Sequence, residues 1–352
     1  MGGSPYENEA FFHQLLSKAT AAGASDIHIK SGQPPGARVR GEMVYFRVDK
    51  ITPTDSRAVA AHLLKGLAQV RDLDEVREID TAYSVPSLGR FRVNVYRQRG
   101  SFAAVLRVIP ATIPTLEDLG VAVACREFCS KTRGLVLVVG AAGNGKSSTL
   151  AAMIGEMNRT RALHVVTIED PIEFLHRDER SSISQREVGL DTPNFATALR
   201  AALRQDPDVI LLGEIRDSET MEIALMAAET GHLVLSTLHT PDVYRTVYRM
   251  LSLATGDPKE MRERIADTLQ GIVAQRLVSR CDREGLVLAS EVLVVTGTVR
   301  EAIKRPDSNP PIKDLIEKGA HPYGMQTFEM HLKHLLGQGI IDRETARLAS
   351  GF

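Results

Sequence analysis

One short stretch, residues 134–150, limits what this chain can fold into more than any other. It opens with an apolar run, Leu135–Val139, which is typical of a buried strand, and continues as GAAGNGKS. These letters fit the pattern G-x-x-x-x-G-K-[ST]. A glycine-rich turn without a ligand is the alternative, but strand, loop and helix follow one another in the order that a phosphate loop requires. We therefore predict a phosphate-binding loop formed by Gly140, Ala141, Ala142, Gly143, Asn144, Gly145, Lys146, Ser147 and Ser148.

The chemistry of such a loop specifies its ligand. Its backbone N–H groups and the positive end of the following helix, expected over residues 147–157, attract phosphate oxygens. We expect Lys146 to contact the β- and γ-phosphates of a nucleotide, and the Ser147 hydroxyl to bind Mg²⁺. The predicted ligands are therefore ATP and Mg²⁺.

A second apolar strand, Val209–Leu212, ends next to an acid. In phosphate-loop nucleotidases the Walker B aspartate occupies such a strand end and helps to hold Mg²⁺. Here Gly213 holds that place and Glu214 follows it. Direct binding of Mg²⁺ by Glu214, binding through water, and activation of the attacking water therefore all stay open.

Another group of acids follows the strand expected over residues 164–168. Glu169, Asp170 and Glu173 crowd the end of that strand, on the side where the phosphate loop should lie. Hydrolysis of ATP needs a group that orients water, and a carboxylate serves this purpose. A loop of solvated acids is the alternative, but the location favours a catalytic role.

Two histidines, His232 and His239, bracket the strand expected over residues 233–237. His239 lies at the carboxyl end, where open α/β sheets bind ligands. Sensing of the γ-phosphate is favoured over a metal site, because no third metal ligand is evident. We place His239 among the catalytic candidates and His232 among the nucleotide-binding ones.

The pattern of strands and helices indicates two domains. Residues 1–110 combine a helix over 7–22 with alternating strands, which predicts a small α+β domain with a mostly antiparallel sheet. Pro110, Pro114 and the polar residues around them break both periodicities, so residues 111–120 form the expected linker. In residues 121–352 strands alternate with helices before a mainly helical C-terminal part, which predicts an α/β fold with a parallel sheet.

Composition excludes several classes of function. The formal net charge is −1, and no apolar run approaches the ~20 residues that cross a bilayer. We therefore expect neither a nucleic-acid partner nor direct insertion into a membrane. Cys125, Cys129 and Cys281 supply neither a disulfide framework nor a four-ligand zinc set. A cytoplasmic location is the expectation for such a chain.

Taken together, these blocks resemble the secretion ATPase superfamily, and most of all the PilT-like retraction ATPases of type IV pili. Residues 169–173 resemble the aspartate box, residues 209–214 the Walker B segment and residues 231–240 the histidine box. The similarity covers nearly the whole chain. It implies a RecA-like P-loop NTPase domain preceded by a PAS-like N-terminal domain. It also implies a homohexamer, with Glu173 as the general base and Glu214 as the Walker B acid.

Two further features bear on the branch of the superfamily. Pilus-extension and type II secretion ATPases usually carry a four-cysteine zinc module in the C-terminal domain, where this chain has only Cys281. That favours the retraction branch, its accessory paralogues or a type IV secretion relative. The helix that retraction ATPases need for retraction corresponds to residues 298–305, of which Arg300 and Ile303 fit and the others diverge. A plain amphipathic surface helix is the alternative for this segment.

Five arginines gather on two neighbouring strands of the N-terminal domain. They can form a solvated face, or some can contact nucleotide phosphates in the hexamer as arginine fingers do. We select Arg92 and Arg107 as catalytic candidates. The full set is Arg90, Arg92, Arg97, Arg99 and Arg107.

The resemblance implies a hexameric ATPase at the cytoplasmic face of the inner membrane, acting on an inner-membrane pilus platform protein. An accessory retraction paralogue and a type IV secretion ATPase are alternatives within the superfamily. A non-hydrolysing, nucleotide-binding regulator would need a damaged site, yet Lys146, Ser147, Glu173 and Glu214 are all present. A nucleic-acid-dependent RecA-type motor is disfavoured by the neutral charge.

Overall fold

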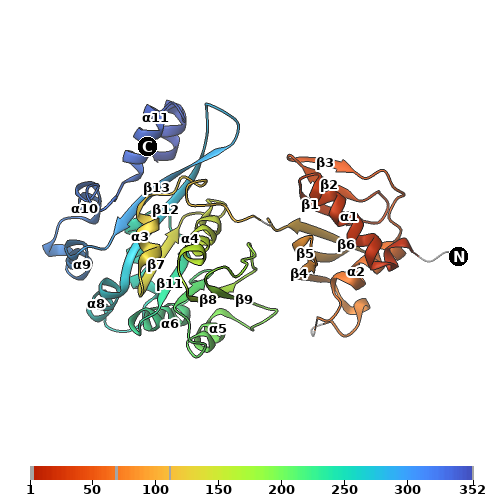
Figure 1. Cartoon of the computed structure of the whole chain (residues 1–352), viewed down its shortest axis with the longest axis horizontal. Coiled ribbons are helices and arrows are strands. Elements are labelled where there is room, and N and C mark those ends of the chain that lie inside the picture. The colour runs from red at the N-terminus through yellow and green to blue at the C-terminus, as the bar shows by residue number, and fades with distance from the viewer. Residues whose placement is uncertain (1–3, 68–69, 111, 351–352) are drawn as a thin grey trace. The chain divides into compact units, whose positions relative to one another are not determined.

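The computed structural model describes residues 4–67, 70–110 and 112–350. The chain forms two compact units, residues 1–111 and residues 112–352 (Figure 1). Each unit has its own sheet and its own hydrophobic core.

The N-terminal unit is built on six strands: β1 (Ala24–Lys30), β2 (Gly36–Val39), β3 (Glu42–Tyr45), β4 (Glu78–Val85), β5 (Gly89–Gln98) and β6 (Ser101–Val108). They form one antiparallel sheet in the order β3-β2-β1-β6-β5-β4. Helix α1 (Glu9–Ala21) packs against β1, and α2 (Pro53–Leu63) packs against β6. Short 3₁₀ turns occupy Pro5–Glu7 and Leu73–Glu75.

Local sequence accounts for these elements. The Thr52 hydroxyl accepts a hydrogen bond from the Asp55 N–H (3.1 Å), and the Asp55 carboxylate accepts one from the Thr52 N–H (2.8 Å), so α2 begins with a complete capping box. Along β5, Phe91 and Val93 are buried whereas Arg92 between them is exposed. This alternation places the arginine on the face opposite the core, as the period of a strand requires.

The C-terminal unit is built on seven strands: β7 (Gly134–Val139), β8 (His164–Glu169), β9 (Ser182–Glu187), β10 (Val209–Leu212), β11 (Leu233–Leu238), β12 (Leu269–Ser279) and β13 (Leu286–Val294). Their order is β13-β12-β7-β11-β10-β8-β9, and every pair of neighbours is parallel except β12 with β13. The α/β fold with a largely parallel sheet, predicted for this part of the chain, is confirmed.

Ten helices belong to the described part of the C-terminal unit, and a 3₁₀ turn at Pro306–Ser308 follows the seventh. The helices are α3 (Ala124–Ser130), α4 (Lys146–Thr160), α5 (Phe195–Ala202), α6 (Ser218–Glu229), α7 (Val243–Leu253), α8 (Pro258–Thr268), α9 (Gly297–Lys304), α10 (Ile312–Lys318), α11 (Phe328–Gly337) and α12 (Arg343–Ser350).

Helices cover both faces of this sheet, and the central strands are buried throughout. Every residue of β7, β10 and β11 is buried. Alternate residues of β7 enter different cores: Val136 packs with residues of α3 and α4, and Leu137 packs with residues of α5 and α6. The continuous apolar runs that predicted these strands therefore reflect burial on both faces.

Three strands escape the sequence patterns. β4 and β9 lie at sheet edges, and β9 is too polar to give an apolar signal. β12 follows α8 without a break, inside the part of the chain expected to be mainly helical, yet it pairs with β7 in the middle of the fold. Its partner lies more than a hundred residues earlier, so no local pattern indicates the pairing.

We expect Gly271→Ala in β12 to lower the free energy of unfolding by ~1–3 kcal/mol, the usual cost of overpacking. An added Cβ would overlap the buried ring of Phe128 and lie 2.8 Å from the Leu293 carbonyl oxygen. Gly297→Ala at the start of α9 is the matched control, because nothing lies within 4 Å of its added Cβ. Chemical denaturation measures both variants, and equal stability would contradict the expectation.

Candidate functional site

Four parallel strands bring the predicted polar groups to one edge of the C-terminal sheet. The phosphate loop follows β7, Glu169 ends β8, Glu214 lies just beyond β10, and His239 lies just beyond β11. Because these strands are neighbours in the order β7-β11-β10-β8, their carboxyl ends meet. Open α/β sheets bind ligands at this edge.

The backbone of the phosphate loop takes a conformation that depends on its glycines. Gly140, Gly143 and Gly145 have φ values of 146°, 79° and 76°, a region that other residues rarely adopt. Gly140 also has no room for a side chain, since an added Cβ would lie 2.5 Å from the Gln275 carbonyl oxygen. Gly145 caps α4, so the loop leads directly into the amino end of a helix, where backbone N–H groups attract anions.

Lys146 is folded back into the loop. Its ammonium donates hydrogen bonds to the carbonyl oxygens of Gly140 (2.9 Å) and Ala141 (3.0 Å), and the residue is buried. Burial lowers the pKa of Lys146, and the negative charges of Glu214 and Glu173 oppose that shift. The lysine and the two predicted catalytic acids therefore interact electrostatically at one site.

β12 supports the phosphate loop from the side, which the sequence did not indicate. The Leu277 N–H donates a hydrogen bond to the side-chain oxygen of Asn144 (3.2 Å). The Gln275 amide donates one to the Thr149 hydroxyl in α4 (2.7 Å), and both side chains are buried. These bonds tie the loop and the start of α4 to a strand distant in sequence.

Glu214 is held by two basic side chains. Its carboxylate lies 3.2 Å from His239 Nε2 and forms an ion pair with Arg216. Arg216 also lies 3.9 Å from Asp170. The hydrogen bond to Glu214 is the main cause of a raised pKa for Arg216. The sequence analysis overlooked Arg216, and its place two residues after the acid is the only local signal that points to it.

Close packing against β8 explains why Gly213, and not an aspartate, occupies the Walker B position. The Gly213 N–H donates a hydrogen bond to the Ile168 carbonyl (2.8 Å). An added Cβ at Gly213 would lie 3.3 Å from that carbonyl oxygen and 3.4 Å from the Cα of Glu169, which is closer than most real contacts. The tight approach of β8 therefore favours glycine here, and the acid occupies the next position as Glu214.

Glu169, the last residue of β8, and the acids that follow it, Asp170 and Glu173, differ in their exposure to solvent. Burial raises the pKa of Glu169, and hydrogen bonds from Thr167, Gln185 and the Glu173 N–H oppose the shift. Glu173 and Asp170 are exposed. Glu169 therefore anchors this segment, whereas the Glu173 carboxylate is accessible to a ligand.

The structure corrects the assignment of His232. It precedes β11, at the opposite edge of the sheet from the phosphate loop, and its carbonyl accepts a hydrogen bond from the N–H of Gly134, where β7 begins. The six residues of β11 span ~20 Å, beyond the reach of a side chain. His232 Nδ1 lies 3.0 Å from the Ala227 carbonyl at the end of α6, which is a structural contact.

In the N-terminal unit, Arg92 and Arg107 are direct neighbours across β5 and β6, and both are exposed. Arg107 donates a hydrogen bond to the Asp26 carboxylate (2.8 Å). No hydrogen bond or ion pair joins the Arg92 side chain to another residue in the described part of the chain. Arg97 has an internal role instead, since its guanidinium lies 3.9 Å above the ring of Phe102.

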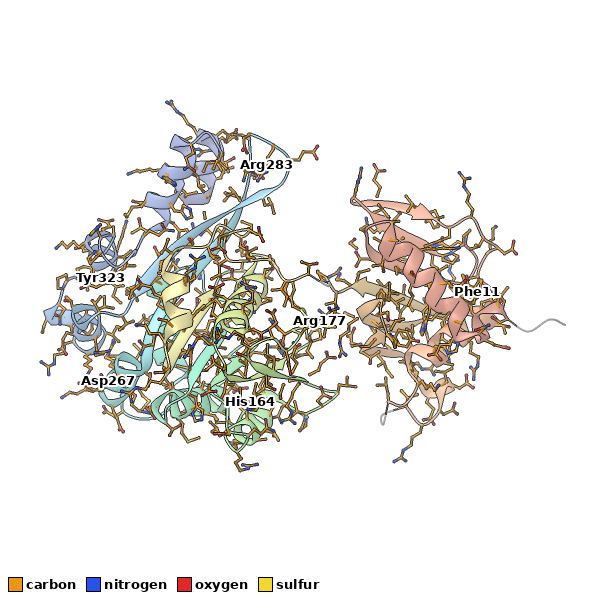
Figure 2. The ribbon with its side chains drawn as sticks, in the orientation of Figure 1. Phe11, His164, Arg177, Asp267, Arg283 and Tyr323 are labelled. Atoms are coloured by element: carbon orange, nitrogen blue, oxygen red, sulfur yellow. The ribbon has the colours of Figure 1, made fainter. Side chains whose placement is uncertain are left out.

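The helix expected over residues 298–305 is α9. Ile303 is buried, and Arg300 donates a hydrogen bond to the Ala266 carbonyl (3.0 Å) and lies 3.7 Å from Asp267, labelled in Figure 2. The two residues that fit the retraction motif therefore lie where α9 packs against α8.

The residues available for Mg²⁺ are oxygen donors. Ser147 lies in the first turn of α4, and the Glu214 carboxylate is 14% exposed. Mg²⁺ is usually held by one or two protein oxygens together with waters and substrate phosphates, so this pair fits the ion. Among residues 4–67, 70–110 and 112–350, no helix has the length and apolar character needed to cross a bilayer.

Comparison with known proteins places these features in context. A family model described as type II/IV secretion system protein matches residues 5–309. The type IV pilus retraction ATPase PilT of Pseudomonas aeruginosa is 41% identical over 335 residues, which cover 95% of this chain and 96% of the relative. The type IV pilus ATPase PilU of the same organism is 38% identical over 95% of this chain and 87% of the relative.

A solved structure agrees with this comparison. The crystal structure of the pilus retraction motor PilT with bound ADP superposes with a TM-score of 0.88 at 40% identity, covering 96% of each chain. The fold of this chain therefore matches that of a nucleotide-binding relative along nearly its whole length.

We expect Lys146→Ala to weaken nucleotide binding roughly 10- to 100-fold, because a charge-assisted hydrogen bond contributes about 1.5–3 kcal/mol. Titration calorimetry with ATP and ADP measures the effect. Lys259→Ala removes an exposed lysine from the start of α8 and is the control. Wild-type affinity in the Lys146→Ala protein would contradict the assignment of the loop.

Proposed function

Because the chain belongs to the type II/IV secretion system protein family, we propose that it is a motor ATPase that hydrolyses ATP to power retraction of type IV pili. Two relatives support this proposal through their names, a type IV pilus retraction ATPase and a pilus retraction motor with bound ADP. Both match nearly the whole chain.

The observation that carries the proposal is the convergence of Lys146, Glu173 and Glu214 at the sheet edge that holds the phosphate loop. A phosphate loop alone binds nucleotide. Hydrolysis also requires a group that positions water and positive charge that balances the phosphates. The exposed Glu173 carboxylate can supply the first, and Lys146, with Mg²⁺ held by Ser147 and Glu214, the second.

Each residue has a separate task in this mechanism. Lys146 exchanges its two loop carbonyls for oxygens of the β- and γ-phosphates. Ser147 and Glu214 would hold Mg²⁺, which neutralises phosphate charge when bound. Glu173 accepts the proton of the attacking water. His239, beside the Glu214 carboxylate, responds to the presence of the γ-phosphate.

We further propose a homohexamer of chains, each with a PAS-like N-terminal domain (residues 1–110), a linker (residues 111–120) and a RecA-like ATPase domain (residues 121–352). The antiparallel sheet with its two helices supports the first assignment, and the parallel sheet with its phosphate loop supports the last. The motor acts at the cytoplasmic face of the inner membrane on a pilus platform protein, without a nucleic-acid partner.

An accessory retraction paralogue is the second candidate. The identity to PilU, 38%, is close to the 41% to PilT, so similarity alone does not separate the two roles. A secretion ATPase differs from the retraction motor and its paralogue because pili would not depend on it. A non-hydrolysing regulator differs from them because it would not turn over ATP.

Deleting the gene tests the function directly. We expect cells that still display type IV pili but do not retract them, because extension continues without the retraction motor. Restoring the wild-type gene restores retraction, and restoring the Lys146→Ala gene does not. Cells without pili would indicate an extension motor, and unchanged retraction would assign the chain an accessory role or reject the proposal.

We expect Glu173→Gln and Glu214→Gln to keep nucleotide binding and to lose most turnover. For Glu173, the proposed general base, kcat should fall by ~10²–10⁴-fold, the usual contribution of general-base catalysis. Each change removes a carboxylate charge and preserves shape. Steady-state ATPase assays measure kcat, with Glu179→Gln as the control because this exposed acid lies in the same segment. Turnover within a few-fold of wild type in both variants would show that neither acid is catalytic.

We also propose that Arg92 or Arg107 supplies positive charge to the nucleotide phosphates during the cycle, from the same chain or a neighbouring one. An arginine that does so contributes up to ~10³–10⁵ in rate in other nucleotide hydrolases. We expect Arg107→Ala or Arg92→Ala to lower kcat for ATP strongly and to change the free energy of unfolding little. Full activity of both variants would assign these arginines to a solvated face.

Mixing two inactive proteins tests whether Arg107 acts on a neighbouring chain. Under conditions of subunit exchange, Lys146→Ala and Arg107→Ala chains form some interfaces with an intact phosphate loop and an intact arginine. Partial return of ATPase activity supports action in trans. If exchange is confirmed by labelled chains and activity stays at the level of the separate variants, Arg107 does not act in trans.

A further inference from the structure

The segment that carries Glu173 has no regular structure of its own. Residues 170–181, between β8 and β9, form neither helix nor strand. A displacement of ~1 Å in a catalytic group can cost ~10²-fold in rate, so something must fix this backbone if Glu173 is to orient water. The hydrogen bonds of the segment show what does.

One side chain of β9 binds the backbone just after Glu173. The Gln185 amide nitrogen donates a hydrogen bond to the Phe174 carbonyl (2.9 Å), and its oxygen accepts one from the His176 N–H (2.8 Å). The same nitrogen donates to the Glu169 carboxylate (3.1 Å). Gln185 thus bonds two backbone groups of the segment and the half-buried carboxylate of Glu169.

Two acids, Glu169 and the buried Glu187, bind the backbone at and before Glu173. Glu187, two residues after Gln185 on β9, accepts a hydrogen bond from the Ile172 N–H (3.1 Å) and is 4% exposed. The Glu169 carboxylate accepts one from the Glu173 N–H itself. Side chains of β8 and β9 therefore hold the main chain on both sides of an exposed carboxylate.

We infer that Gln185 is a positioning residue for Glu173. Its side chain bonds the main chain just after Glu173. It also bonds the carboxylate of Glu169, which in turn accepts a hydrogen bond from the Glu173 N–H. An amide is required because the position needs two donated bonds and one accepted bond, a combination that neither a carboxylate nor a thioether offers. The inference rests on the proposed function, since it assumes that Glu173 acts in ATP hydrolysis.

The inference predicts a specific kinetic signature. Gln185→Glu replaces the donor with a carboxylate beside Glu169, and Gln185→Met removes all three bonds without adding charge. We expect each change to lower kcat about 10- to 100-fold, with KM for ATP and affinity for ADP within about threefold of wild type. Gln205→Glu makes the same chemical change at an exposed position after α5 and should leave kcat unchanged.

A double variant separates positioning from general damage. If Gln185 acts through Glu173, Gln185→Met adds little to the loss already caused by Glu173→Gln. Overturning results are wild-type kcat in both single variants, a double variant slowed by the product of the two single effects, or failure of both single variants to fold. Absence of ATPase activity in the wild-type protein would instead reject the proposed function, and the inference with it.

Discussion

The parallel pairing of β7, β11, β10 and β8 is the constraint on which the rest of the site depends. Parallel strands end at a common edge, so groups that follow different strands meet although they are far apart in sequence. The phosphate loop, Glu169, Glu214 and His239 share that edge for this reason. Burial on both faces of the sheet holds the strands in this order, since every residue of β7, β10 and β11 is buried.

The edge alone does not position the predicted catalytic groups, because loops follow the strands. The phosphate loop and the segment around Glu173 are each held by a neighbouring strand through hydrogen bonds. β12 bonds Asn144 of the phosphate loop through its Leu277 N–H, and β9 bonds the segment around Glu173 through Gln185 and Glu187. These are the two strands that flank β7, β11, β10 and β8, so the outer parts of the sheet support the edge that carries the phosphate loop.

Charged side chains at this edge have partners within the protein. Lys146 is buried against two loop carbonyls, and the charges of Glu214 and Glu173 partly offset the cost of burying its ammonium. Glu214 is paired with Arg216 and lies close to His239. In the proposed mechanism, Lys146 and Glu214 exchange some of these contacts for nucleotide phosphates and Mg²⁺.

The sequence by itself determined the phosphate loop, the parallel sheet and the acids at the strand ends. Glycine spacing and apolar runs are local, and a residue that follows a strand is recognised without knowledge of any partner. Tertiary structure alone decided that His232 lies at the far edge, that β12 is a strand beside β7, and that Gln185 holds the segment around Glu173. These depend on which segments pair, and that is set by packing between residues far apart in the chain.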